Sequence, residues 1–409
     1  MAQILKNDDI FNLLTLRYNP SEYSPDVPLK AEKFIEKTIE DIEPKVIQIV
    51  KKDLHSKLSQ VSRVSIALSG GIDSRFTLMM LRKFFPELKI DAICAGFGDN
   101  DDEISVAKDV AQKYNCEFHE IYLNNILEDL PKLISIVGMP RWNLYQFYTL
   151  EKAKDYSRIF YSGDGGDETF GGYVFRYYKF LTELNRLKNH SWLDKSKIYL
   201  SCHERDWVPN QEEIFNKNLK FSWMKIYENF RPYFDNSLEP LDQVFLADFN
   251  GKLLYDWIPS NLKFGKHLDI DINSVFLNPE MIEFTSGLPW HIKYDYATNI
   301  GKLPLISILK KLEGNGNIPG IKKGFSLNLI NMWNKYGEEV ITAHLNKDSE
   351  SVKNDIINIK WINESLTLIG NSMNNNLRIR YISKLLSILS FEVWYRIFIS
   401  HTLKSSVKL

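Results

Sequence analysis

A six-residue stretch, Ser69-Gly70-Gly71-Ile72-Asp73-Ser74, combines residue types that bind phosphate with one that binds metal ions. Adjacent glycines let the backbone turn tightly and approach a ligand closely. The free N–H groups at the start of the helix that follows favour an anion, and the serine hydroxyls add donors. Asp73 would repel phosphate unless a divalent cation lay between them. The stretch therefore predicts a site for a nucleotide with Mg²⁺.

A second glycine-rich stretch, residues 162–173, reads Ser-Gly-Asp-Gly-Gly-Asp-Glu-Thr-Phe-Gly-Gly-Tyr. Its five glycines surround three carboxylates, which a solvated charged turn rarely needs. If both stretches follow strands of one parallel sheet, they meet at the carboxyl edge of that sheet. Asp73 and Asp167 would then share one Mg²⁺. The alternative is two unrelated acidic turns.

A third candidate is the glycine-rich basic loop 314–325, which contains Lys322. Most such loops are surface connections. Beside an ATP site, however, Lys322 would stabilise charge that develops on phosphate or on an oxyanion.

The surrounding pattern predicts how these loops are positioned. Apolar runs at 64–68, 90–95, 118–123 and 158–161 predict strands, and the segments between them have helical spacing. This alternation predicts an α/β fold with a doubly wound parallel sheet over 61–175, followed by a mainly helical half over 176–400. Turn signals predict a loosely ordered leader over 1–28, and 30–58 predicts a helix that breaks near Pro44.

Composition excludes several classes of protein. The net charge is −1, so nothing global indicates a nucleic-acid or membrane partner. The three cysteines are scattered, which favours a reducing cytoplasm. The late apolar run 385–399 contains Glu392 and Arg396 and is too short to span a bilayer, so it predicts a buried helix.

Together, the stretches 69–74 and 162–173 resemble the synthetase domain of asparagine synthetase B and its relatives, which include β-lactam synthetases. These enzymes belong to the ATP pyrophosphatase superfamily. Weaker matches at 275–278, 322–325 and 387–398 extend the resemblance over about residues 60 to 400.

The resemblance implies an ATP-dependent ligase that activates a carboxylate as an acyl-adenylate, with AMP and pyrophosphate as products. Ammonia or an amine would then attack the acyl group. By resemblance, ATP phosphates contact Ser69, Gly70, Gly71, Asp73 and Ser74, and adenosine meets Leu68, Ala95, Ser162 and Gly163. Asp73 and Asp167 would bind Mg²⁺, Lys322 would be the catalytic lysine, and Asp164 would act near the nucleophile or its proton.

The chain departs from the family first at its start. Only about 68 residues precede Ser69, and Ala2 stands where glutamine-dependent relatives have a nucleophilic cysteine. The sequence therefore predicts that 1–60 holds no glutaminase domain. Nitrogen would come from free ammonia, from a separate glutaminase subunit, or from an amine on a larger substrate.

The acceptor motifs depart as well. The family pattern Glu-x-Arg-x-Pro-Phe-Leu-Asp becomes Asp271-Ile-Asn273-Ser-Val275-Phe-Leu-Asn278, and the arginine two residues before Lys322 becomes Gly320. Neither Asn nor Gly can replace the bidentate contacts of arginine. A small-molecule carboxylate is expected as the substrate, but aspartate is not assumed. Two other readings are a tRNA-modifying ATP pyrophosphatase, which shares the first loop, and a non-catalytic ATP-binding descendant.

Overall fold

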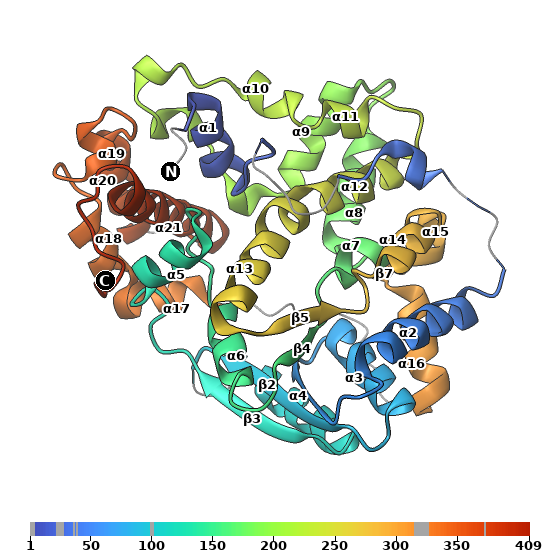
Figure 1. Cartoon of the computed structure of the whole chain (residues 1–409). Helices are drawn as coiled ribbons and strands as arrows, with labels where there is room; N and C mark the ends of the chain where they lie inside the picture. The colour runs from blue at the N-terminus through green and yellow to red at the C-terminus, as the bar shows by residue number, and fades with distance from the viewer. Residues whose placement is uncertain are drawn as a thin grey trace.

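A parallel sheet runs from near the lower edge of the view in Figure 1, at β3, to its middle, at β5. The computed structural model describes residues 5–21, 28–35, 37, 40–98, 102–314, 327–371 and 374–409. The strand order is β3-β2-β1-β4-β5, and every neighbouring pair is parallel. The four predicted strands are confirmed as β1 (Arg63–Ala67), β2 (Lys89–Gly96), β3 (Glu117–Tyr122) and β4 (Ile159–Ser162).

The fifth strand, β5 (Asp271–Ser274), was not predicted from the sequence and comes from the helical half of the chain. It pairs with β4 from Ile159↔Asp271 to Ser162↔Ser274. Its four residues carry only one aliphatic side chain, too little for a strand pattern. It forms because the edge of β4 offers unpaired backbone groups. The second half of the chain therefore completes the sheet that positions the site.

Helices cover both faces of the sheet, which confirms the doubly wound arrangement. Along β4, Phe160 packs into one apolar cluster and Tyr161 into the other, because neighbouring residues of a strand point to opposite faces. The Tyr161 cluster includes α2 (Ile42–Leu58), α3 (Ile72–Phe84), α4 (Asp102–Lys113) and α16 (Leu303–Glu313). The Phe160 cluster includes α5 (Leu130–Val137), α6 (Gln146–Ala153), α13 (Ile258–Leu268) and α21 (Asn375–Phe398).

The second half is mainly helical, as predicted, and α21 is its longest buried helix. Glu392 within α21 is buried, but its carboxylate accepts hydrogen bonds from the backbone N–H groups of Glu350 and Ser351. These two residues are at the start of α19 (Glu350–Lys353). The positive end of that short helix offsets the carboxylate charge. Within the described ranges, we find no helix with the length and apolar character needed to cross a membrane.

The N-terminal segment is more ordered than predicted. Residues 7–16 form α1 (Asn7–Leu16), and the expectation of a loose leader is wrong for them. Phe11 and Leu14 are buried, and the Leu14 carbonyl accepts hydrogen bonds from Gln211 and Lys384. In Figure 1, α1 lies beside the C-terminal helices, which it contacts through α21. The turn signals that follow α1 led to the prediction of a loose leader, so the apolar spacing within α1 was overlooked.

The predicted helix over 30–58 begins later than expected. A short 3₁₀ helix, η1 (Ala31–Phe34), precedes α2, which starts at Ile42. Pro44 therefore lies in the first turn of α2, where no intrahelical N–H is needed. It marks the beginning of the helix and not a break within it.

Candidate active site

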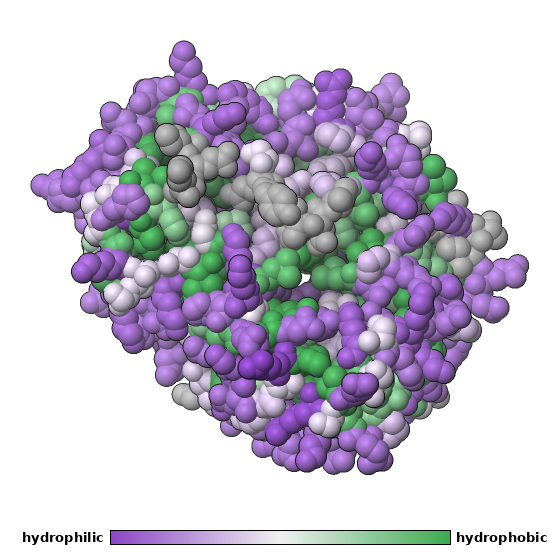
Figure 2. Space-filling model, in the orientation of Figure 1, coloured by the Kyte–Doolittle hydropathy of each residue, from purple (hydrophilic) through white to green (hydrophobic). Residues whose placement is uncertain are grey.

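A cavity of about 480 Å³ opens at the carboxyl ends of β1, β2 and β4. It lies where the strand order reverses between β1 and β4, the usual ligand position in open parallel sheets. Its floor is the loop after β1, and its far wall comes from η5 (Phe249–Trp257), a π-helix, and from α13. In the view of Figure 2, the surface of the molecule has an opening near its middle, edged by hydrophobic residues.

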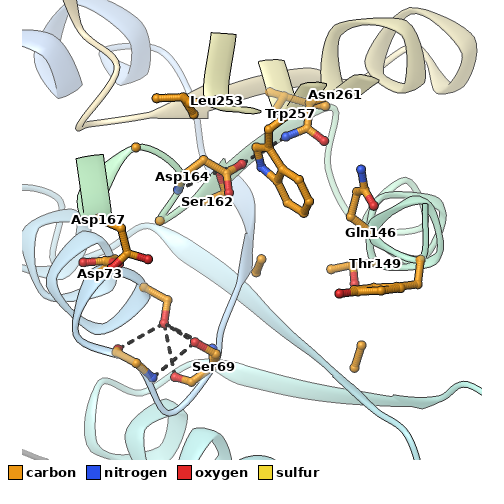
Figure 3. Close-up of a pocket in the computed structure, with 18 of the residues that line it drawn as sticks. Ser69, Asp73, Gln146, Thr149, Ser162, Asp164, Asp167, Leu253, Trp257 and Asn261 are labelled. Carbon is orange, nitrogen blue, oxygen red and sulfur yellow. Dashed lines mark hydrogen bonds between the residues drawn. The ribbon is translucent and has the colours of Figure 1, made fainter. Parts of the chain in front are cut away.

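The loop after β1 is held by its two serines. The Ser69 backbone N–H donates to Ser74 Oγ at 3.1 Å, and the Gly71 N–H donates to Ser69 Oγ at 3.2 Å. Ser74 Oγ also donates to the Ser69 carbonyl at 3.1 Å (Figure 3). Gly71 is the N-cap of α3, so the helix start faces the cavity as predicted. This arrangement suits an anion.

The second glycine-rich loop lies directly against the first, as the sequence predicted. A Cβ on Gly163 would come within 2.8 Å of Asp73 Cβ, and one on Gly166 within 2.5 Å of Asp73 Cγ. A Cβ on Gly172 would lie 1.8 Å from Asp167 Oδ1. These positions therefore have no room for a side chain. Gly163 and Gly166 are needed because α7 (Gly166–Phe170) begins in contact with Asp73 of the loop after β1. Gly172 is needed because Asp167 and Lys302 lie beside it.

Asp73 and Asp167 meet at one buried cation. The ammonium of Lys302 lies 2.5 Å from Asp73 Oδ2 and 2.6 Å from Asp167 Oδ1. The Lys302 side chain is only 4% exposed. Burial alone would lower the pKa of Lys302, but the two carboxylates outweigh it and raise that pKa. Lys302 was missed from the sequence, because a lone lysine after a glycine carries no motif.

Two carboxylates at one point fit a divalent cation. Among the described residues there is no group of three or more His, Cys, Asp or Glu side chains that could enclose a metal. Mg²⁺ is commonly held by one or two carboxylates together with substrate phosphates. The donor set is therefore suited to Mg²⁺ that arrives with a nucleotide, and Asp73 and Asp167 are the residues that would hold it.

Asp164 projects into the middle of the cavity (Figure 3). Its Oδ2 accepts hydrogen bonds from Ser162 Oγ at 2.7 Å and Asn261 Nδ2 at 3.0 Å. Burial raises the pKa of Asp164, and the hydrogen bond from Ser162 offsets only part of that effect. A buried carboxylate with a raised pKa can accept a proton from an incoming group.

The cavity wall also has apolar parts that suit a base. Ala95 and Gly163 line the cavity, as predicted for adenosine, and so do Ile93 and Phe160. Leu68 also lines the cavity, but its N–H already donates to the Ile93 carbonyl at 2.9 Å. Its carbonyl is therefore the group that remains for a ligand. Gln146 Oε1 and Asn261 Oδ1 are buried without a hydrogen-bond partner among the described residues.

Of the predicted site residues that the structure describes, Gly70 is not part of the cavity wall. Gly70 faces Val106 of α4, and a Cβ on Gly70 would lie 3.2 Å from Val106 Cγ1. Lys322, the predicted catalytic lysine, lies outside the described residues, as does Gly320. The role of Lys322 therefore stays a prediction.

Asn278 stands where the family has an acid, and its side chain makes contacts that hold the fold together. It is the N-cap of α14 (Pro279–Ser286), because its Oδ1 accepts from the Glu280 N–H at 2.8 Å. Its Nδ2 donates to Asp53 Oδ1 of α2 at 2.7 Å. The amide thus joins two elements behind the sheet, and an acid here would face the Asp53 carboxylate.

We predict that Asn278→Asp destabilises the protein by roughly 2 kcal/mol, because it loses the donor to Asp53 and adds a like charge. Urea unfolding should detect the change, while affinity for ATP should stay within twofold of the wild type. Asn371→Asp, at an exposed C-cap, is the control and should shift stability little. An unchanged midpoint for Asn278→Asp would show that its amide does not matter.

Comparisons with known proteins agree with this geometry. The family model described as asparagine synthase matches residues 45–396. The chain is 23% identical to asparagine synthetase [glutamine-hydrolyzing] 1 of Bacillus subtilis (strain 168) over 299 residues, 64% of this chain and 47% of that protein. It is 32% identical to putative asparagine synthetase [glutamine-hydrolyzing] 2 of Methanocaldococcus jannaschii over 141 residues, 32% of this chain and 27% of that protein. The matches thus span less than half the length of either relative.

Proposed function

The chain belongs to the asparagine synthase family, and from that premise we propose that it is an ATP-dependent ligase that activates a carboxylate as an acyl-adenylate and passes the acyl group to ammonia or an amine. Family membership supports a carbon–nitrogen ligase in general. The observation that carries the finer proposal is the pair of glycine-rich loops, which bring Asp73 and Asp167 together beside a phosphate-type loop. The family match also favours this reading over a tRNA-modifying pyrophosphatase.

The chemistry follows from the weakness of a carboxylate as an acyl donor. Its leaving group would be oxide, so the carboxylate oxygen attacks the α-phosphorus of ATP and pyrophosphate leaves. Ser69, Gly71 and Ser74 line the cavity. They would hold the phosphates through N–H and hydroxyl groups that bond within the loop when no ligand is bound. When bound to Asp73 and Asp167, Mg²⁺ would neutralise charge on the pyrophosphate. The leaving group of the acyl carbon is then AMP.

The second half of the reaction needs a proton acceptor. The attacking nitrogen must lose a proton as the amide forms, and Asp164 is the carboxylate between the phosphate loop and the far wall. Its raised pKa makes it a better base than an exposed aspartate. Ser162 and Asn261 orient it by hydrogen bonds to a single oxygen. Lys322 remains a further proposed participant that would stabilise charge in the transition state.

We predict that the protein forms AMP and pyrophosphate, but not ADP, when incubated with ATP, Mg²⁺, ammonium and its own carboxylate. A screen of carboxylates with a coupled pyrophosphate assay and chromatography of the nucleotides checks this. Omission of the carboxylate is the matched control and should abolish AMP formation. A complete screen that yields no AMP would contradict the proposal. If calorimetry also detected no binding of ATP with Mg²⁺, the non-catalytic reading would replace it.

A further inference from the structure

Glu313, the last residue of α16, is a nearly buried acid that three side chains contact. Its side chain is only 2% exposed. Arg75 donates to both carboxylate oxygens, from Nε to Oε1 at 3.0 Å and from Nη2 to Oε2. Lys113 Nζ donates to Oε2 at 2.7 Å, and the Tyr114 hydroxyl donates to Oε1. Burial alone would raise the pKa of Glu313, but these hydrogen bonds outweigh it and lower that pKa to about 2. The carboxylate is therefore ionised at neutral pH.

The pair of Glu313 and Arg75 joins two helix positions where each charge is locally unfavourable. Glu313 stands at the end of α16, where the unpaired helix carbonyls repel an anion. Arg75 stands near the start of α3, where the free N–H groups repel a cation. The stability of each helix by itself would favour the opposite charges. The two residues therefore indicate a requirement for contact between the helices.

Two of the helices that meet at Glu313 position the stretch 69–74 directly. The first turn of α3 is part of that stretch, and Arg75 is the residue that follows it. From α4, Val106 Cγ1 lies 3.2 Å from where a Cβ on Gly70 would stand, so this helix packs against the turn. Glu313 thus joins the helix that continues from the stretch to the helix that supports its glycines.

The third helix, α16, is attached to the start of α3 at both of its ends. At the first end, the N-cap Lys302 pairs with Asp73, and its backbone N–H donates to the Phe170 carbonyl at 3.0 Å. Its φ of 57° is in the left-handed region, which residues other than glycine hold where the surrounding structure enforces it. At the other end, Glu313 pairs with Arg75. Figure 1 shows α3 and α16 side by side, where the two helices contact each other. The two attachments together fix how α16 crosses α3.

From these contacts we propose that Glu313 is a positioning residue, which fastens α3, α4 and α16 and so fixes the stretch 69–74 in the geometry that receives nucleotide phosphates. Neither Glu313 nor Arg75 is among the described residues that line the cavity, so both act from outside it. Donors of a binding site must be held to within a fraction of an ångström, so a contact behind the site can control affinity. The inference rests on the proposed ligase function for the identity of the ligand, ATP with Mg²⁺.

Calorimetry of the full-length protein with two ligands separates positioning from a general loss of structure. α,β-Methylene ATP with Mg²⁺ probes the phosphate position, and adenosine probes the base position alone. We expect Glu313→Gln to bind the ATP analogue about tenfold more weakly and to bind adenosine as tightly as the wild type. An unchanged affinity for the ATP analogue, or an equal loss of affinity for both ligands, would overturn the proposal. Glu364→Gln, at an exposed ion pair with Lys360, is the control and should bind both ligands like the wild type.

A double-mutant cycle tests whether Arg75 acts through the same contact. Arg75→Gln should also weaken binding of the ATP analogue, and the double variant should bind it no more weakly than Glu313→Gln, because both changes break one ion pair. Losses that add in full would overturn the shared role of the pair.

A milder variant keeps the test decisive if Glu313→Gln does not fold. Tyr114→Phe removes one neutral donor and leaves the ion pair of Glu313 with Arg75 in place. It should lower affinity for the ATP analogue about threefold, since one hydrogen bond to the carboxylate is lost, and leave adenosine affinity unchanged. Urea unfolding shows which variants are folded. Wild-type affinity for the ATP analogue in a folded Tyr114→Phe would then overturn the proposal.

The two proposals fail in different ways. If Glu313→Gln selectively loses the ATP analogue but no carboxylate yields AMP with the wild type, the ligase proposal fails and the positioning role stands. If the wild type yields AMP and Glu313→Gln binds the ATP analogue as tightly as the wild type, the positioning role fails and the ligase proposal stands.

Discussion

Replacing Asp167 by asparagine should lower the rate of AMP formation by about 10³-fold or more, because the pyrophosphate leaving group loses a metal ligand that neutralises its charge. The same loss is expected for Asp73→Asn. Both carboxylates contact the Lys302 ammonium, so they lie close enough together to share one metal ion. Each would supply one of the two protein ligands of the proposed metal site. The amide keeps the size of the side chain, and Lys302 retains one partner in either variant. Folding should therefore survive.

Single-turnover measurement of AMP at saturating ATP separates chemistry from binding. Raising Mg²⁺ should recover part of the activity, since a weakened site fills at higher concentration. Asp155→Asn, at an exposed ion pair with Lys152, is the matched control and should be as active as the wild type. Wild-type activity in Asp167→Asn would remove this residue from the proposed metal site.

The sequence predicted well those parts of the site where steric or electrostatic requirements restrict which residue type can stand at a position. Gly163 and Gly166 are required where α7 approaches Asp73, and such requirements show in the sequence as glycines between acids. The three central strands, β1, β2 and β4, were likewise visible, because burial on both faces of a sheet gives short apolar runs.

The parts that sequence reasoning missed depend on contacts between distant segments. Lys302 lies more than two hundred residues from Asp73 and matches no local pattern. β5 exists because an edge of β4 is available, and Arg17 lines the cavity because α1 packs on α21. In each case tertiary packing gives an ordinary residue its role. Spacing within the chain cannot reveal such a role.

Lys302 best tests whether tertiary packing gives an ordinary residue its role. Lys302→Met should destabilise the metal-free protein by about 3–5 kcal/mol, because it leaves two mostly buried carboxylates without their shared cation. Asp73 and Asp167 are each only 13% exposed, so water can offset little of their repulsion. Urea unfolding in EDTA measures the effect.

Magnesium should then stabilise Lys302→Met more than the wild type, since in the wild type the ammonium competes with the metal for the same two carboxylates. The expected signature is a larger rise in unfolding free energy with Mg²⁺ concentration for the variant, as linkage requires when the folded state alone binds the ion. Lys311→Met, at an exposed pair with Glu43, controls for loss of a lysine and should shift stability by less than about 0.5 kcal/mol. If Mg²⁺ stabilised the Lys302 variant no more than the wild type, Asp73 and Asp167 would be a structural ion-pair centre, and the metal would have to bind through other groups.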